Sequence, residues 1–201
     1  FITGGAGFIG SHIVDRVLKM GGEVVVYDNL STGQLKFLDS AKLNKNFELI
    51  VGDLLDKDLL NASISGCDMV FHMAANADIR HGLENPYNDI EQNTIVTFNL
   101  LEAMRGSNVK RIVFASSAAA LGEPEQFPTP ESCAVPIQTS LYGASKMACE
   151  GLISSYCEGY GFEGYAFRFV SLLGPRYPHG HVFDFVKKLR HDSSKLEVLG
   201  D

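Results

Sequence analysis

A glycine-rich segment stands near the start of the sequence, at residues 3–10, Thr3-Gly4-Gly5-Ala6-Gly7-Phe8-Ile9-Gly10. It satisfies G-x-G-x-x-G from Gly5 and G-x-x-G-x-x-G from Gly4. Glycines at these spacings permit a tight turn, close approach of the backbone to a pyrophosphate, and close packing of a helix on a strand. The helix that follows contributes free N–H groups and the positive end of its dipole. Glycine-rich turns are also common structural punctuation, so the pattern needs support from its context.

The stretches around this turn alternate between strand and helix patterns. An amphipathic helix is predicted from Phe8 to Met20. Two more long helices are predicted, from Pro86 to about Met104 and from Ser140 to about Tyr156. Apolar runs typical of buried parallel strands cover residues 23–27, 47–51, 69–71, 111–114 and 165–169. This alternation predicts an α/β fold with a doubly wound parallel sheet of the Rossmann type.

Composition narrows the class of protein. The 201 residues are 45% hydrophobic and carry a net charge of −7, which excludes a disordered chain and argues against a nucleic-acid binder. No apolar run approaches the ~18 residues of a membrane span, so no membrane partner is expected. The cysteines form no CxxC pair, which favours reduced thiols, a cytoplasmic location and no metal site. They are Cys67, Cys133, Cys149 and Cys157.

Acidic residues follow the second and third predicted strands. Asp28 lies 18 residues after Gly10, where a carboxylate would accept hydrogen bonds from an adenosine ribose. Its charge would repel a 2′-phosphate, and residues 28–34 contain no Arg or Lys, so NAD is favoured over NADP. The alternative for Asp28 is an ordinary turn residue beside Asn29. Asp53 could face the adenine amino group, or it could cap a helix.

A tyrosine and a lysine stand four residues apart on the third helix. Tyr142 and Lys146 therefore share one helix face, although such a pair also arises by chance. A phenol of pKa about 10 is a poor base, and the positive charges of Lys146 and an oxidised nicotinamide would favour the phenolate. Ser117 leaves the sheet 25 residues before Tyr142, so both would lie at the carboxyl edge of the strands. Ser117 could bind a substrate hydroxyl, or it could cap its own backbone.

These motifs occur together in a known family. The sequence resembles the extended short-chain dehydrogenase/reductase superfamily, and within it the UDP-galactose 4-epimerase-like nucleotide-sugar enzymes. The resemblance covers nearly the whole chain. It is carried by TGGAGFIGSH, YDNLSTG, VGDLLD, FHMAA, FASSAAALGEP, YGASKMACE, RFVSLLGPR and HVFDFVKKL followed by LEVLGD.

The resemblance implies a set of cofactor contacts and two domains. Besides the turn glycines Gly4, Gly7 and Gly10, the residues implied to touch NAD are Phe8, Ile9, Asp28, Asn29, Asp53, Leu54, Ala74, Asn93, Tyr142 and Lys146. We expect residues 1–170 to form the NAD-binding domain and residues 171–201 to begin a smaller substrate domain, most of which is missing. The first residues read as the end of a strand whose beginning is missing.

Two positions after Ser117 distinguish reaction types within the resemblance. Similar sugar 4,6-dehydratases carry an Asp-Glu pair there, UDP-glucuronate decarboxylases carry a Glu, and GDP-sugar 3,5-epimerase/reductases carry a Cys. This chain has Ala118 and Ala119, which transfer no proton. What remains is chemistry that needs only Ser117, Tyr142, Lys146 and NAD, and reversible hydride transfer at one carbinol carbon fits it.

The predicted function is an NAD-dependent epimerase that inverts C4 of a UDP-hexose. Tyr142 would remove the 4-hydroxyl proton while Ser117 holds that oxygen, and the 4-keto sugar would turn over in the site. Alternatives are a UDP-uronate or UDP-N-acetylhexosamine 4-epimerase, another NAD-dependent nucleotide-sugar oxidoreductase, or a non-catalytic NAD-binding sensor.

Substrate contacts are predicted less completely. Ser171 stands where the family usually has an Asn that helps hold the substrate diphosphate. Cations for that diphosphate could be Arg176, Arg168 or Lys187, although the pattern favours a solvated charge for each of them.

Other polar and apolar residues have structural interpretations. His179 and His181 favour packing on the substrate side over metal binding, and His72 favours a hydrogen-bonded core position. Apolar residues on more than one face of the second and third helices would suit a homodimer or a buried core equally.

Overall fold

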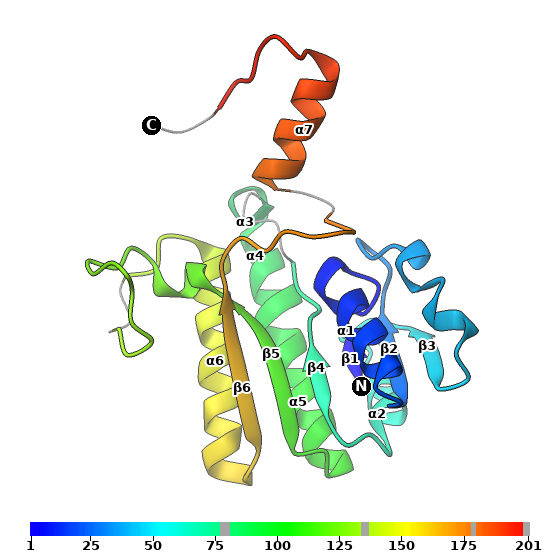
Figure 1. Ribbon diagram of the computed structural model, residues 1–201. Helices are drawn as coiled ribbons and strands as arrows, with labels where there is room; N and C mark the ends of the chain where they lie inside the picture. The colour runs from blue at the N-terminus through cyan, green and yellow to red at the C-terminus, as the bar shows by residue number, and fades with distance from the viewer. Residues whose placement is uncertain (77–80, 134–136, 178–179, 199–201) are drawn as a thin grey trace. The chain divides into compact units, whose positions relative to one another are not determined.

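Six parallel strands form a single sheet in the order β3-β2-β1-β4-β5-β6 (Figure 1). The computed structural model describes residues 1–76, 81–133, 137–177 and 180–198. The strands are β1 Ile2–Thr3, β2 Val24–Asp28, β3 Phe47–Val51, β4 Val70–His72, β5 Arg111–Ser117 and β6 Glu163–Phe169. This order reverses direction between β1 and β4, and ligands bind at such a switch point in open α/β sheets.

Helices connect the strands. They are α1 Phe8–Lys19, α2 Lys57–Ile64, α3 His81–Glu84, α4 Pro86–Asp89, α5 Val96–Ser107, α6 Leu141–Tyr160 and α7 His181–His191. Shorter helical turns are η1 Leu35–Leu38, η2 Ala41–Leu43, the π-helical η3 Ile90–Ile95 and η4 Ala118–Leu121. Ser140 caps α6, because its side chain accepts a hydrogen bond from the backbone N–H of Gly143.

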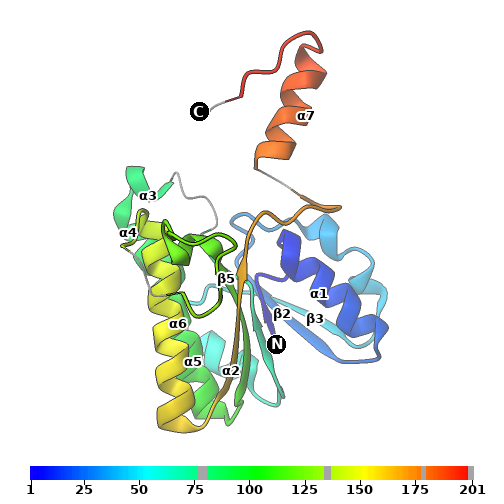
Figure 2. The same cartoon turned by 60° about the vertical axis from the view of Figure 1, so that its left-hand side comes forward.

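The sheet has helices on both faces (Figure 2). Figure 2 shows α1 on one side of the strands and α2, α5 and α6 on the other. Alternating residues of β2 illustrate the two layers, since Val26 joins a core cluster with Val14 of α1 while Tyr27 joins one with Leu60 of α2. The doubly wound Rossmann-type sheet predicted from the sequence is therefore confirmed.

One predicted helix is interrupted. Residues 86–107 form α4, the π-helical η3 and then α5, so the predicted helix from Pro86 to about Met104 is confirmed as helical throughout, but it contains a π-helical segment. A π-helical turn widens the backbone and often occurs at functional sites. Here it contains Asn93, which is 1% exposed and lies beneath α6. The helix α2 escaped prediction although Asp56 caps it by accepting a hydrogen bond from the N–H of Leu59.

The chain divides into two compact units, Phe1–Ser171 and Leu172–Asp201. The first unit contains the whole sheet, and the second contains α7. Among the described residues, no helix is long and apolar enough to cross a membrane. The same residues include no group of three or more His, Cys, Asp or Glu side chains arranged to hold a metal ion.

Candidate active site

The glycine-rich turn joins β1 to α1 and is built almost entirely from backbone. Gly4 has φ of +66°, and a Cβ there would lie 2.6 Å from the backbone nitrogen of Ala74. A Cβ on Gly10 would lie 2.2 Å from the carbonyl oxygen of Gly4. Gly7 differs, because a Cβ there would have only the Gly4 oxygen within 4 Å, at 3.1 Å. The turn is therefore closed toward β4 and open beside Gly7.

The N-terminus of α1 suits an anion. Gly7 is the N-cap and makes no side-chain capping bond, and the first turn contains no acidic residue. Phe8, Ile9 and Gly10 begin a helix of 12 residues, and the N–H groups of the first turn of a helix have no acceptor within it. A diphosphate fits this cradle by its charge and by the space beside Gly7.

Asp28 ties the turn to β2. Its Oδ2 accepts a hydrogen bond from the N–H of Ala6 at 2.9 Å, and its Oδ1 accepts one from the N–H of Leu30 at 2.9 Å. Asp28 is 8% exposed at the carboxyl end of β2. Each carboxylate oxygen can accept a second hydrogen bond. The ribose contact predicted for Asp28 is compatible with this geometry, and the same carboxylate shapes the loop.

Asp53 and its neighbours line the next strand end. Asp53 Oδ2 accepts a hydrogen bond from Asn29 Nδ2 at 2.9 Å, and its Oδ1 accepts one from the N–H of Leu55. The alternative that Asp53 caps a helix is wrong, because α2 begins later and Asp56 caps it. Leu54 is 6% exposed and belongs to the core.

Ser117, Tyr142 and Lys146 come together at the carboxyl end of β5. Lys146 is 2% exposed, and its Nζ donates a hydrogen bond to the carbonyl oxygen of Ala115 at 2.9 Å. That Nζ lies 5.8 Å from the centre of the Tyr142 ring. Ser117 ends β5 and caps η4 by accepting from the N–H of Ala119, and its side chain, which lies beside that of Tyr142, lowers the Tyr142 pKa by hydrogen bonding. The capping alternative for Ser117 and its predicted place beside Tyr142 are thus both observed.

Electrostatics at this cluster differ from the sequence-based expectation. Burial raises the pKa of Tyr142, the hydrogen bond from Ser117 opposes this, and the charges of Asp89 and Cys149 reinforce it. Burial likewise lowers the pKa of Lys146 to about 8, against the raising influence of Cys149 and Asp89. The chain alone therefore does not favour the phenolate. A cation beside the phenol, such as an oxidised nicotinamide, would supply the missing stabilisation.

A buried polar network supports α6, the helix that carries Tyr142 and Lys146 and is called the catalytic helix below. Asn93 Oδ1 accepts a hydrogen bond from the N–H of Asn76 at 2.8 Å, and its Nδ2 donates to Ser145 Oγ at 2.8 Å. Ser145 in turn donates to the carbonyl oxygen of Tyr142 at 2.8 Å. Asn93 was implied to touch NAD. Its amide is engaged on both sides by the protein, so the structure shows it as a support for α6, and a cofactor contact stays a prediction.

His72, at the end of β4, is linked to this network through Thr97, whose hydroxyl donates a hydrogen bond to the carbonyl oxygen of Asn93. Its Nδ1 lies 2.7 Å from Thr3 Oγ1 and its Nε2 lies 2.9 Å from Thr97 Oγ1. Burial, with a smaller contribution from Lys146, lowers the pKa of His72 to about 3. The prediction of a hydrogen-bonded core histidine is confirmed. Ala74 follows β4, and its N–H donates to Thr3 Oγ1.

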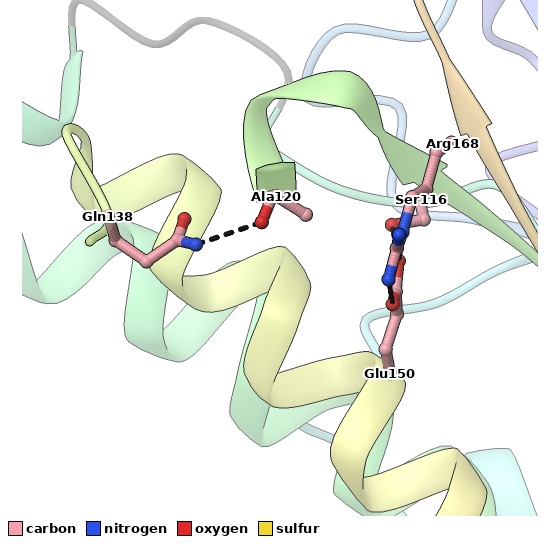
Figure 3. A network of polar contacts seen from close by, with 5 residues as sticks. All are labelled: Ser116, Ala120, Gln138, Glu150 and Arg168. Atoms are coloured by element: carbon pink, nitrogen blue, oxygen red, sulfur yellow. Dashed lines mark hydrogen bonds and ion pairs between the residues drawn. The ribbon is translucent and has the colours of Figure 1, made fainter. Parts of the chain in front are cut away.

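Arg168 is held by the catalytic helix (Figure 3). Its guanidinium donates two hydrogen bonds to the carboxylate of Glu150, which also accepts one from Ser116. The expectation that Arg168 is available for a substrate diphosphate is therefore corrected, because Glu150 already balances its charge. Sequence patterns missed Glu150, since it is 18 positions from Arg168 and belongs to a different element.

The other residues predicted to contact substrate stay predictions. Ser171 is exposed at the end of the first unit, while Arg176 and Lys187 belong to the second unit. His181 begins α7, and His179 lies outside the described residues.

Comparisons with known proteins identify the family of this chain. The model of the NAD dependent epimerase/dehydratase family matches residues 1–201. The UDP-glucose 4-epimerase of Streptomyces lividans is 37% identical over 100% of this chain and 62% of its own length. Two solved structures are similar. One is the UDP-N-acetylglucosamine 4-epimerase from Methanobrevibacter ruminantium M1 in complex with UDP-N-acetylmuramic acid, with a TM-score of 0.90 and 33% identity over 100% of this chain and 64% of that chain.

The other is the UDP-glucose 4-epimerase of Thermus thermophilus in complex with NAD, with a TM-score of 0.81 and 37% identity over 92% of this chain and 60% of that chain. The chain thus spans less than two thirds of these relatives. The family match extends over every element described above, from the glycine-rich turn to α7. The chain belongs to the NAD dependent epimerase/dehydratase family, whose nucleotide-sugar epimerases the sequence resembles.

Proposed function

We propose that this chain is the cofactor-binding portion of an NAD-dependent nucleotide-sugar epimerase that inverts C4 of a UDP-hexose. The observation that carries the proposal is the convergence of Ser117, Tyr142 and Lys146 at the sheet edge that also holds the glycine-rich turn. The relatives support it, since the similar structures include 4-epimerases solved with NAD and with a UDP-sugar.

Each of the three residues has one role. Bound NAD supplies a reversible hydride acceptor, which interconverts the C4 carbinol and a ketone. Tyr142 takes the 4-hydroxyl proton and later returns it. Ser117 holds the same oxygen through its hydroxyl, and Lys146 places a positive charge beside the Tyr142 ring. The cofactor diphosphate would be held at the start of α1 by Gly7, Phe8, Ile9 and Gly10, and Asp28 would accept a hydrogen bond from its ribose.

The two residues that follow Ser117 favour epimerisation over elimination. Ala118 and Ala119 begin η4 immediately after Ser117, and neither side chain can transfer a proton. A dehydratase needs a residue that removes a second proton and protonates a leaving hydroxyl. The residues after β5 therefore support a reaction that begins and ends at C4.

The direct test uses the full-length protein with NAD and either UDP-glucose or UDP-galactose. Interconversion of the two sugars without net formation of NADH is expected. NADH that accumulates with an oxidised product would overturn the proposal in favour of a sugar dehydrogenase. Retained NAD with no turnover of UDP-hexoses, UDP-uronates or UDP-N-acetylhexosamines would identify a binding protein instead. Turnover of only one of the last two classes would move the proposal to that sugar.

The variant Tyr142→Phe tests the assigned base. Without the phenol oxygen, kcat should fall by about 10²- to 10⁴-fold, the usual contribution of a general acid–base group. Bound NAD should be retained, as measured after release from the purified protein. The variant Tyr160→Phe, at the exposed far end of the same helix, should leave kcat unchanged.

Three further assignments belong to this proposal. Residues 171–201 would begin the substrate-binding region, and Ser171 and Arg176 are each proposed as substrate contacts. A homodimer is compatible with the exposure of Ile90 and Phe98, which are 47% and 42% exposed. No disulfide joins the cysteines that the structure describes, and thiols kept reduced favour the cytoplasm.

A further inference from the structure

Glu150 of α6 contacts two neighbouring strands with one carboxylate. Its Oε1 accepts hydrogen bonds from Ser116 Oγ at 2.5 Å and from Arg168 Nε at 3.0 Å. Its Oε2 accepts one from Arg168 Nη2 at 2.8 Å. Figure 3 shows the Glu150 side chain rising from the helix to meet Ser116 and Arg168 together. A planar guanidinium bound through two parallel hydrogen bonds fixes orientation as well as distance.

The two strand residues are partners in the sheet. Ser116 of β5 pairs with Arg168 of β6, and the next pair is Ser117 with Phe169. Glu150 therefore joins α6 to both strands one residue before Ser117. Lys146, one helical turn before Glu150, is bonded to the carbonyl oxygen of Ala115.

Three consecutive residues of β5 thus meet three residues of one helix. The carbonyl oxygen of Ala115 accepts a hydrogen bond from Lys146, the hydroxyl of Ser116 donates one to Glu150, and Ser117 lies beside Tyr142 and lowers its pKa. A fourth contact lies beyond the strand, where Gln138, just before α6, donates a hydrogen bond to the carbonyl oxygen of Ala120 at 2.8 Å (Figure 3).

The Glu150 contact is largely sheltered from water. The side chains of Glu150 and Arg168 are 14% and 29% exposed. Burial opposes ionisation of Glu150, but the hydrogen bonds from Arg168 and Ser116 outweigh it, so the pKa of Glu150 lies below its ordinary value. Glu131 and Cys133 also face Arg168.

The same strand pair carries a second ion pair, which differs in both exposure and neighbours. Arg111 and Glu163 are sheet partners at the amino ends of β5 and β6, with Nε and Oε2 3.2 Å apart. Their side chains are 58% and 56% exposed. Exposed pairs of this kind contribute little to stability. This pair links the two strands alone, whereas Glu150 links them to the catalytic helix.

We propose that Glu150 is a positioning residue, which through Ser116 and Arg168 holds Ser117 in register with Tyr142. This inference rests on the proposed function, because Ser117 and Tyr142 act on substrate only there. The ion pair itself touches no reacting atom. Its effect on chemistry comes through the alignment of β5 with α6.

The test compares Glu150→Gln with Glu163→Gln in the full-length protein loaded with NAD. Glutamine keeps the length of the side chain but removes the charge that binds both strands. We expect Glu150→Gln to lower kcat by about 10- to 100-fold, the size expected from a misplacement near 1 Å. NAD content and KM for UDP-galactose should remain near the values of the unmodified protein. Glu163→Gln should leave kcat unchanged.

The pH profile separates positioning from simple loss of stability. The groups that face Tyr142 are Ser117 from β5, Asp89 from α4, and Cys149 and Lys146 from α6. Among these groups, Ser117 is the hydrogen-bond partner that lowers the Tyr142 pKa. Loosening the contact between Ser117 and Tyr142 raises the pKa of Tyr142. The acid limb of kcat/KM should therefore move to higher pH in Glu150→Gln. A merely destabilised protein would lose active molecules without moving this limb.

Arg168→Lys provides a second route if Glu150→Gln fails to fold. It keeps the charge and loses the two parallel hydrogen bonds, so the same fall in kcat and the same shift are expected. Normal kcat and an unmoved acid limb in whichever variant folds would overturn the proposal.

A readout without turnover keeps the two proposals distinguishable. If the unmodified protein epimerises no sugar, the proposed function fails, and phenolate absorbance then decides the positioning role. Subtracting the Tyr142→Phe titration isolates Tyr142. A higher Tyr142 pKa in the Glu150 variant supports positioning, and an unchanged one excludes it.

Discussion

The two halves of the sheet build their parts of the site from different materials. Beside β1, β2 and β3 the site is built around the backbone of the glycine-rich turn, with Gly4 and Gly10 packed so closely that no Cβ fits, and the Asp28 carboxylate holds that turn. Beside β4, β5 and β6 it consists of side chains, including the buried Lys146 and Asn93. The first half offers N–H groups to an anion, whereas the second arranges groups that exchange protons.

This difference determines what holds each half in place. The glycine-rich turn keeps its shape because its residues are adjacent in sequence and its glycines carry no side-chain atoms. The catalytic half depends on hydrogen bonds between distant positions, such as Asn93 with Ser145, which are 52 residues apart. Buried polar networks of this kind stabilise a site when they are complete and are costly when one member is lost.

Gly10→Ala should have the largest effect on the backbone half. Its methyl group would lie 2.2 Å from the Gly4 oxygen and 2.8 Å from the Gly5 Cα, so the backbone itself must move. We expect destabilisation of about 1–3 kcal/mol, as for overpacked sites, together with loss of NAD binding. Denaturant unfolding and calorimetric titration with NAD measure the two effects.

Gly7→Ala is the matched control for that prediction. Its methyl group has open space apart from one contact at 3.1 Å to Gly4, and its φ of −80° suits alanine. The fold should be less affected than in Gly10→Ala, while NAD binding is still lost because the methyl group occupies the open side. NAD binding by Gly7→Ala with normal affinity would show that the cofactor lies elsewhere.

His72 offers a way to disturb the catalytic half through pH. Its pKa is about 3 in the folded protein and 6.5 as the ordinary value, so between these values the unfolded state binds the extra proton. Its contribution to stability is therefore complete above pH 6.5 and is lost as pH falls toward 3. The loss should be about 1.4 kcal/mol per pH unit for one proton.

His72→Gln isolates this contribution, because glutamine has no proton to gain in that range. Denaturant unfolding at a series of pH values should give a shallower decline for the variant than for the unmodified protein. Equal slopes would show that other groups, such as buried carboxylates, cause the acid sensitivity.

The sequence predicted the parts whose determinants are local. Five features each occupy a recognisable place in a strand, turn or helix, and each lies at the carboxyl ends of the parallel strands as expected. They are the glycine-rich turn, Asp28, Ser117, Tyr142 and Lys146. Their place at that edge follows from the order of strands and helices along the chain, whereas their chemical roles stay predictions.

What sequence patterns missed depends on contacts between elements. The interruption of the second helix at Ile90–Ile95 has no signal in hydrophobic periodicity, because the apolar residues continue through it. Arg168 was misread for the same reason, since a lone cation in a strand reveals nothing of the Glu150 carboxylate opposite it. Partners 18 or more positions apart become visible only when the helices are packed on the sheet.

Asp28→Asn should have a moderate effect confined to the backbone half. The amide retains an acceptor for one backbone N–H, but it loses the charge and presents a donor to the other, Ala6 or Leu30. We expect NAD affinity to fall about 10-fold, which corresponds to about 1.4 kcal/mol for one charged hydrogen bond. Affinity for NADP should rise relative to NAD, and competition titrations measure the ratio. An unchanged ratio would mean that the carboxylate serves only the loop.

Gly106→Ala should have the smallest effect, and it tests whether a glycine outside the turn is dispensable. Gly106 lies in the exposed last turns of α5, in the catalytic half, and a Cβ there meets nothing within 4 Å. Alanine should stabilise the protein by about 0.4–1 kcal/mol, because it restricts the unfolded chain and favours the helix. NAD affinity and kcat should not change. The comparison would then be complete, because Gly106 can be replaced with a gain in stability whereas replacing Gly7 or Gly10 abolishes NAD binding. That contrast would show that close backbone approach at the turn makes its glycines necessary.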